Sequence, residues 1–169
     1  MPLKKLLTVK KDATFKGVIA FDLGRNMAWA YRDWVYEDEI KAYNRLYDGI
    51  RSHRFGAFMH DFPKITEGNP FTVLVYETPF ARGRDATRSL WGLAGILEAC
   101  GTKAKMAVVD VAVPTIKKFA TGDGRASKDD MIAAAKKFGY AGNNEHEADA
   151  VCLLMYAEAN LQRVREKIK

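Results

Sequence analysis

The chain has 169 residues, 48% of them hydrophobic, which is enough apolar material to fill one core without disulfide bonds. Its formal net charge of +6 indicates an anionic partner such as a nucleic acid, although a merely basic soluble surface would give the same balance. No apolar stretch is long enough for a signal peptide or a bilayer span, which argues against an exported or membrane-embedded protein.

The two cysteines, Cys100 and Cys152, both lie in apolar stretches with helical character. A reduced cysteine in such a place behaves as a small buried hydrophobic residue. We therefore expect a cytoplasmic protein of one domain spanning residues 1–169, with residues 1–16 as a basic leader.

In the first half of the chain, apolar runs predict strands and one helix. GVIAFDLG (17–24) is typical of a buried strand, and NMAWAYRDWVY (26–36) could supply two more in a meander. From Glu37 to about Phe58, apolar residues recur at helical spacing and predict the first helix: Ile40, Tyr43, Tyr47 and Ile50. Pro63 and the stretch 68–70 then break the chain before FTVLVYE (71–77), the clearest strand.

In the second half, helices dominate. The pattern predicts a helix over about 86–99, a strand at 103–111, a short helix from Pro114 to about 119, a helix over 128–138 capped by Ser127, and a long helix from Glu145 to about Lys167. This order of elements favours an α/β domain with a central mixed sheet covered by helices on both faces.

Two carboxylates stand where charge is costly. Asp22 and Glu77 each close an apolar strand, and a buried carboxylate needs a cationic partner. Each alone could face solvent or make a local hydrogen bond. Their occurrence at two matching strand ends indicates a shared cation.

The last helix adds a third group of polar residues. His146 and Asp149 are three residues apart and therefore project from the same face, where they can hold one metal ion. Glu145 also reaches the face of Asp149 and is a competing ligand, whereas Glu147 points away and is expected at the surface. Acidic residues in a first turn also stabilise the helix dipole, but Asp149 lies a turn further in.

The donor types indicate the metal. Carboxylate oxygens with one imidazole suit Mg²⁺ or Mn²⁺, and the chain has no Cys-x-x-Cys pair or His-rich tract for structural zinc.

The segments VIAFDLG, VLVYETPF and HEADAVCLLMYA resemble, in order, the three acidic motifs of the RuvC family, a branch of the RNase H-like nuclease superfamily. The resemblance extends from Val18 to about Tyr156. It implies an RNase H-like fold with a five-stranded mixed sheet, and a Holliday junction resolvase that makes paired nicks in four-way DNA junctions.

The resemblance also implies catalytic and metal-binding roles for Asp22, Glu77, His146 and Asp149, with two divalent ions roughly 3.5–4 Å apart. Many members of the family carry Asp-x-x-Asp where this chain has His146-Glu147-Ala148-Asp149. That departure leaves His146 and Glu145 as alternatives for the fourth ligand.

DNA-binding residues follow from the same resemblance. Phe80, three residues after Glu77, is placed where RuvC-like proteins stack an aromatic ring on an unpaired base, though a phenylalanine at a strand exit can also be ordinary core. The expected phosphate contacts, which could equally be solvated charges, are Arg82, Arg84, Lys117, Lys118, Arg125 and Lys128.

A homodimer is also implied. Trp91, Gly92 and Gly95 lie away from the leucine-rich face of their helix, and small residues there would let another helix approach. The alternative is packing of Trp91 within its own domain.

Three other functions compete with this interpretation. An RNase H-like nuclease acting on flaps, other branched DNA or RNA–DNA hybrids would share the same acidic pattern. An actin-like ATPase would use FDLG in a phosphate-binding hairpin, but such enzymes need two related domains. A non-catalytic nucleic-acid binder would not need possible metal ligands at all four positions.

Overall fold

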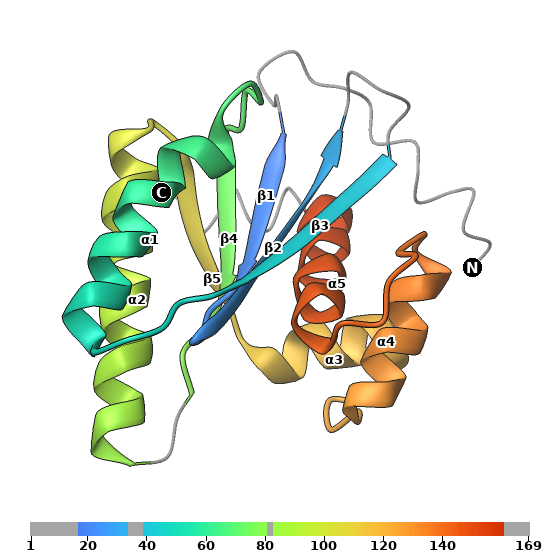
Figure 1. Cartoon of the computed structure of the whole chain (residues 1–169). Helices are drawn as coiled ribbons and strands as arrows, with labels where there is room; N and C mark the ends of the chain where they lie inside the picture. Colours follow the sequence, from blue (N-terminus) through green and yellow to red (C-terminus); the bar gives the residue numbers. More distant parts are fainter. Residues whose placement is uncertain (1–16, 34–38, 81–82, 161–169) are drawn as a thin grey trace.

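The computed structural model describes residues 17–33, 39–80 and 83–160, so the predicted basic leader lies outside the described residues. Five strands form one sheet in the order β3-β2-β1-β4-β5, with β1 parallel to β4, β4 parallel to β5, and β1, β2 and β3 antiparallel (Figure 1). The sheet is therefore mixed, as predicted. The strands are β1 (Val18–Asp22), β2 (Asn26–Asp33), β3 (Glu39–Leu46), β4 (Val73–Glu77) and β5 (Ala107–Val111).

Helices cover both faces of the sheet, which confirms the predicted α/β architecture. In Figure 1, α1 and α2 lie on one side of the sheet, and α3, α4 and α5 lie on the other. The helices are α1 (Arg51–Thr66), α2 (Arg84–Lys103), α3 (Val113–Thr121), α4 (Lys128–Lys137) and α5 (Glu145–Ala159).

The alternation of side chains along β1 decides which residues meet α5. Ile19 and Phe21 belong to the core under α1 and α2, whereas Val18 and Ala20 belong to the core under α5. Successive side chains in a strand point to opposite faces, so Asp22 shares the α5 face with Ala20. The register pairs Asp22 with Ala28, which is also part of the core under α5.

After its polar first turn, α5 is apolar on almost every side, which is typical of a helix buried within a domain. Its buried residues run from Ala148 through Leu154 with Asp149 between them only partly exposed. Small residues of the sheet beneath it, Ala20 and Ala30, are fully buried. The first turn of α5 is thus held firmly over the end of β1.

Two predictions about elements were wrong. Glu39–Leu46 is a strand and not part of a helix, and the first helix begins only at Arg51. Ile40 packs toward α5 while Tyr43 lies on the opposite face of the sheet, as the alternation of side chains in a strand requires. Pro63 does not break the chain: it is exposed and lies within the last turn of α1. Helix α5 ends at Ala159, and most of its predicted continuation lies outside the described residues.

Cys100 and Cys152 are both free thiols, and Cys152 is fully buried as expected for a small hydrophobic residue. Within the part of the chain that the structure describes, no helix combines the length and the apolar character needed to cross a membrane.

Candidate metal and active site

The site begins at the carboxyl end of β1. Asp22 is the last residue of this strand, and only 8% of its surface is exposed. Its Oδ2 atom lies 2.8 Å from Nδ1 of His146 in the first turn of α5. Residues 124 positions apart in the sequence are thereby joined by a hydrogen bond.

The start of α5 is fixed by a side-chain cap. The Asn144 side chain accepts hydrogen bonds from the backbone N–H groups of His146 (3.0 Å) and Glu147 (3.1 Å). Asparagine is a favoured N-cap because its side-chain oxygen satisfies donors that have no partner within the helix. This cap sets the direction in which His146 leaves the helix toward Asp22.

Glu77 enters the site from the neighbouring strand. It is the last residue of β4, which runs parallel to β1 with Phe21 opposite Tyr76. The parity of β4 places Glu77 on the α5 face, because Val73 and Val75 belong to that core. Burial raises the pKa of Glu77 well above its ordinary value, and the nearby Asp22 and Asp149 carboxylates raise it further.

Asp149 lies one turn into α5 and completes the acidic cluster. Burial and the negative charge of Asp22 raise the pKa of Asp149 to about 7. Burial likewise raises the pKa of Asp22, although its hydrogen bond to His146 acts in the opposite direction. The same hydrogen bond raises the pKa of His146. The structure thus brings Asp22 and His146 into contact, and Glu77 and Asp149 lie near enough for the charge of Asp22 to raise their pKa values.

These residues fit a divalent cation by donor type and charge. The carboxylates raise one another's pKa because too little positive charge lies nearby to balance them. A divalent cation that prefers oxygen ligands would supply that charge. Among the described residues, however, no three carboxylate, imidazole or thiol groups form a set that could hold a metal ion in the present arrangement. The hydrogen bond between His146 and Asp22 occupies atoms that would otherwise be ligands. A divalent ion could therefore bind here only if these side chains were rearranged.

Two lysines lie within electrostatic reach of the acidic cluster. The positive charge of Lys117 acts to lower the pKa values of Glu77 and Asp149, and its Nζ donates a 2.6 Å hydrogen bond to the carbonyl oxygen of Ala126. Lys128 forms an ion pair with Glu145, and 75% of its side chain is exposed. Glu145 in turn has an oxygen 3.7 Å from Nε2 of His146. Glu145, the alternative to His146 as fourth ligand, therefore lies next to His146, and its charge is balanced by Lys128.

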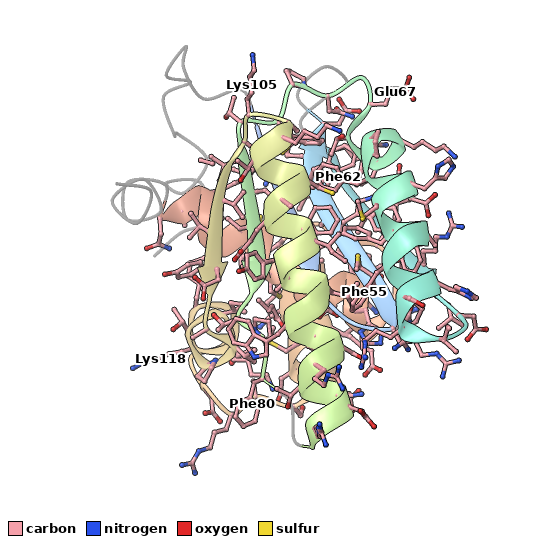
Figure 2. The ribbon with its side chains drawn as sticks, turned by 90° about the vertical axis from the view of Figure 1, so that its left-hand side faces the viewer. Phe55, Phe62, Glu67, Phe80, Lys105 and Lys118 are labelled. Carbon is pink, nitrogen blue, oxygen red and sulfur yellow. The ribbon has the colours of Figure 1, made fainter. Side chains whose placement is uncertain are left out.

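The other predicted DNA-binding residues are less closely tied to the site. Arg84, Lys118 and Arg125 are exposed, and Phe80 and Lys118 lie toward the same end of the molecule in Figure 2. Phe80 is 79% exposed, so the alternative of an ordinary core phenylalanine is wrong. Arg82 falls outside the described residues.

Several partners of the site were not identified from the sequence. Glu147 was expected at the surface, but it is partly buried and accepts hydrogen bonds from Tyr140 (2.6 Å) and the Asn44 side chain. These bonds attach the first turn of α5 to the edge strand β3 and to the end of α4. The capping residue Asn144 was detectable, since asparagine directly precedes the helix.

No known protein-family profile and no curated protein sequence matches this chain. Solved structures do. RuvC from Thermus thermophilus has 13% sequence identity and a TM-score of 0.69, covering 87% of this chain and 96% of that one. The structure of the same protein in complex with a Holliday junction substrate has 13% sequence identity and a TM-score of 0.71, and the match covers 90% of this chain and 97% of that one.

The yeast mitochondrial Holliday junction resolvase is similar over 90% of this chain and 81% of its own, with 12% identity and a TM-score of 0.64. Identities this low establish shared architecture rather than shared chemistry. The chain therefore has the RNase H-like fold of RuvC, with its acidic cluster at the carboxyl ends of two parallel strands and under the first turn of α5.

Proposed function

We propose that this protein is a divalent-metal-dependent endonuclease that cuts four-way DNA junctions by paired nicks. The observation that carries the proposal is the convergence of Asp22, Glu77 and Asp149, with His146, from three distant segments of a RuvC-like fold. One of the similar structures is of RuvC in complex with a Holliday junction substrate. Residues 1–169 would act as one nuclease domain.

The acidic residues would hold Mg²⁺ or Mn²⁺, with two ions as the expected number. Bound divalent ions would activate a water for in-line attack on a phosphodiester and stabilise the leaving 3′ oxygen. Asp22 is the most central of the four residues, because it contacts His146 and its charge raises the pKa of both Glu77 and Asp149. We assign it the role of ligand shared between the ions.

His146 and Glu145 remain two candidates for the fourth ligand. Rotation of His146 away from Asp22 would free a carboxylate oxygen and an imidazole nitrogen together. Release of Glu145 would cost its ion pair with Lys128, a small loss because the lysine is mostly exposed. The comparison of His146→Ala with Glu145→Gln in metal-binding assays distinguishes the two.

DNA would bind across the basic and aromatic residues around this cluster. Phe80 presents an exposed ring that can stack on an unpaired base at a junction. Phosphate contacts are assigned to the basic residues of the prediction: Arg82, Arg84, Lys117, Lys118, Arg125 and Lys128.

Paired nicking requires two sites, and we propose a homodimer through α2. Gly92 does not contribute to this contact, because a Cβ atom there would lie 2.5 Å from Cζ of Phe55 in α1, so its small size serves packing inside the domain. Trp91 is 52% exposed and a Cβ at Gly95 would meet no atom within 4 Å. These two positions leave room for a partner helix.

The same acidic arrangement would serve an RNase H-like nuclease specific for flaps, other branched DNA or RNA–DNA hybrids. Both enzymes would act on nucleic acid inside a cell, and for the junction resolvase we propose the cytoplasm of a bacterial or phage-infected cell.

The deciding experiment is cleavage of a synthetic mobile four-way junction with Mg²⁺, with Mn²⁺ and without metal. Flap and RNA–DNA hybrid substrates are run in parallel. Symmetric nicks near the branch point, dependent on metal and absent from the other substrates, are the expected result. Cutting of hybrids or flaps alone would establish the alternative nuclease, and no cutting of any substrate would refute both.

A further inference from the structure

A second surface, on the face of the sheet opposite the acidic cluster, is lined by aromatic and charged side chains. It is a hollow of about 320 Å³ between α1 and strands β2 and β3, which is within the usual size of small-ligand sites. Its wall on the sheet is aromatic, with Trp29 and Tyr31 from β2 and Tyr43 from β3. This aromatic groove takes no part in the chemistry assigned to the acidic cluster.

The three rings of the aromatic groove form a row. Trp29 and Tyr43 are stacked with ring centroids 6.0 Å apart, and Tyr31 and Tyr43 are stacked at 6.3 Å. Tyr43 nevertheless leaves 45% of its surface exposed, because β3 is the edge strand of the sheet. Large exposed rings on a sheet are costly in water unless a partner covers them.

Charge around the rings favours a phosphate-bearing partner over an apolar one. Arg45 and Lys64 line the aromatic groove together with one carboxylate, that of Asp61, which leaves an excess of one positive charge. Asp61 is buried and bonded to Arg45 at 2.7 Å, so it is withdrawn from an incoming ligand. Burial and the neighbouring Tyr43 raise the pKa of Tyr31 to about 12, so this phenol adds no negative charge at neutral pH.

The position of the aromatic groove relates it to the acidic cluster. Asp22 of β1 pairs with Ala28 of β2, and Ala28 pairs with Asn44 of β3, which lies between Tyr43 and Arg45. Two strand spacings of about 4.8 Å therefore separate Asp22 from Asn44 along the sheet, and the neighbours of Asn44, Tyr43 and Arg45, line the groove on the opposite face. Because β3 is the edge strand of the sheet, a DNA strand that reached both sites would pass around β3.

We infer that the aromatic groove holds an unpaired base of the DNA substrate, stacked on Tyr43 with its phosphate toward Lys64 and Arg45. This inference rests on the proposed nuclease function for the identity of the nucleic acid, but the binding itself requires no metal. A single-stranded segment leaving the acidic cluster around β3 would supply the base. Aromatic rings beside positive charge are the usual platform for single-stranded nucleic acid.

The test compares how tightly the protein binds two oligonucleotides of ten nucleotides in the absence of metal. One consists of deoxythymidines, and the other has the same number of phosphates but no bases. Affinity is measured by fluorescence anisotropy for the full chain. The parent should prefer the deoxythymidine oligonucleotide, and Tyr43→Ala should weaken that binding by between about fivefold and a hundredfold, the range for stacking one base on one ring. Binding of the abasic oligonucleotide should not change.

Matched variants separate stacking from damage to the fold. Tyr43→Phe keeps the ring and should bind like the parent, whereas Tyr43→Leu keeps apolar bulk and should behave like Tyr43→Ala. Thermal unfolding of each variant verifies that it is folded. Phe80→Ala should leave the Tyr43 effect intact, because Phe80 follows β4 near the acidic cluster.

Location is tested by photocrosslinking with an oligonucleotide that carries 5-iododeoxyuridine. The crosslinked peptide should contain Trp29 or Tyr43. Equal affinity of the parent for the two oligonucleotides, unchanged binding by Tyr43→Ala, or crosslinks only elsewhere would overturn the inference. If the protein cuts junctions normally and shows any of these outcomes, the proposed nuclease function stands and the inference about the aromatic groove is refuted.

Discussion

In the described part of the chain, Asp61 and Asp22 are both buried carboxylates, and they differ in what surrounds the charge. Asp61 in α1 is 6% exposed, forms an ion pair with Arg45 (2.7 Å) and accepts a hydrogen bond from the Tyr47 hydroxyl (3.1 Å). Asp22 is almost equally buried, at 8%, but it lies beside two further carboxylates. Burial is therefore no guide to function here, whereas the balance of charge is.

The difference has an energetic meaning. A buried charge that is paired and hydrogen-bonded contributes to a unique fold, and removal of its partner is costly. A cluster of like charges whose pKa values are raised costs stability until a cation or protons neutralise it. The acidic cluster is thus held in place by the packing of α5, at the expense of electrostatic energy.

The largest expected effect is on catalysis. Asp22→Asn keeps the shape of the side chain but removes the charge shared by the proposed metal ions. Metal ions contribute several kcal/mol to such reactions, so junction cleavage should fall by at least about a thousandfold. Cleavage of a labelled four-way junction in Mg²⁺ or Mn²⁺ measures it.

Asp61→Asn is the matched comparison for that experiment, because it neutralises the other buried carboxylate, and it should lower the cleavage rate far less than Asp22→Asn does. Junction binding by Asp22→Asn in Ca²⁺, measured by anisotropy, should persist. An Asp22→Asn protein that still cuts at the parental rate refutes the assignment of the site.

The next effect is on stability and concerns Asp61. Asp61→Ala leaves Arg45 and the Tyr47 hydroxyl without their acceptor and should lower the free energy of unfolding by about 2–4 kcal/mol. For a chain of this size that corresponds to a fall in Tm of roughly 5–15 °C. Calorimetry measures it, and an unchanged Tm would show that the pairing of Asp61 is not what stabilises α1 against β3.

Asp149→Asn should raise the free energy of unfolding in metal-free buffer, in contrast to Asp61→Ala. The pKa of Asp149 is raised from its ordinary 3.8 to about 7, so the folded state prefers the protonated form, and stability falls as pH rises from about 4 to 7. Asparagine removes this penalty, which should make the variant more stable than the parent by about 1–3 kcal/mol at pH 8. The two proteins should be equally stable at pH 4. Urea unfolding at both pH values tests the sign, and a destabilised variant at pH 8 would contradict it.

Divalent cations should stabilise the parent in a pH-dependent way. Binding needs deprotonated carboxylates, and the raised pKa values of Glu77 and Asp149 mean that protons compete with the metal near neutral pH. With cation at ten times its Kd, the gain is about 1.4 kcal/mol, or a few degrees in Tm. The shift with Mg²⁺ should be larger at pH 8 than at pH 6 and absent in Asp149→Asn. An equal shift in that variant would place the ion elsewhere.

The sequence predicted the acidic cluster better than it predicted the aromatic groove, and the reason is physical. Asp22 and Glu77 end apolar strands, so the cost of their burial can be recognised locally. The Asn144 cap and the spacing of His146 and Asp149 are also local features. Only the direct hydrogen bond between His146 and Asp22 could not be predicted from the sequence, because the two residues meet only in the folded chain.

The aromatic groove could not be predicted, because its β3 residues were assigned to a helix, although Trp29 and Tyr31 were correctly assigned to a strand. Ile40 and Tyr43 are three apart, which fits a helical face, but in the edge strand β3 they lie on opposite sides of the sheet. An edge strand has one open side and lacks the continuous apolar run that identifies β1 and β4. The pairing of Trp29 with Tyr43 depends on strand register, which is a property of the folded sheet.

The smallest effects should come from the two lysines beside the acidic cluster, and they distinguish positive charge that serves DNA from positive charge that serves the fold. Lys128 is mostly exposed and its ion pair with Glu145 is a surface pair, so its ammonium is free to move to a phosphate. Lys128→Ala should weaken junction binding several-fold and reduce the slope of log Kd against log salt by about one. Lys117 is partly buried and bonded to the Ala126 carbonyl, so Lys117→Ala should change the slope less while lowering Tm more. If both variants bind junctions like the parent at every salt concentration, then neither lysine contacts DNA, and the positive charge around the cluster serves only to offset its carboxylates.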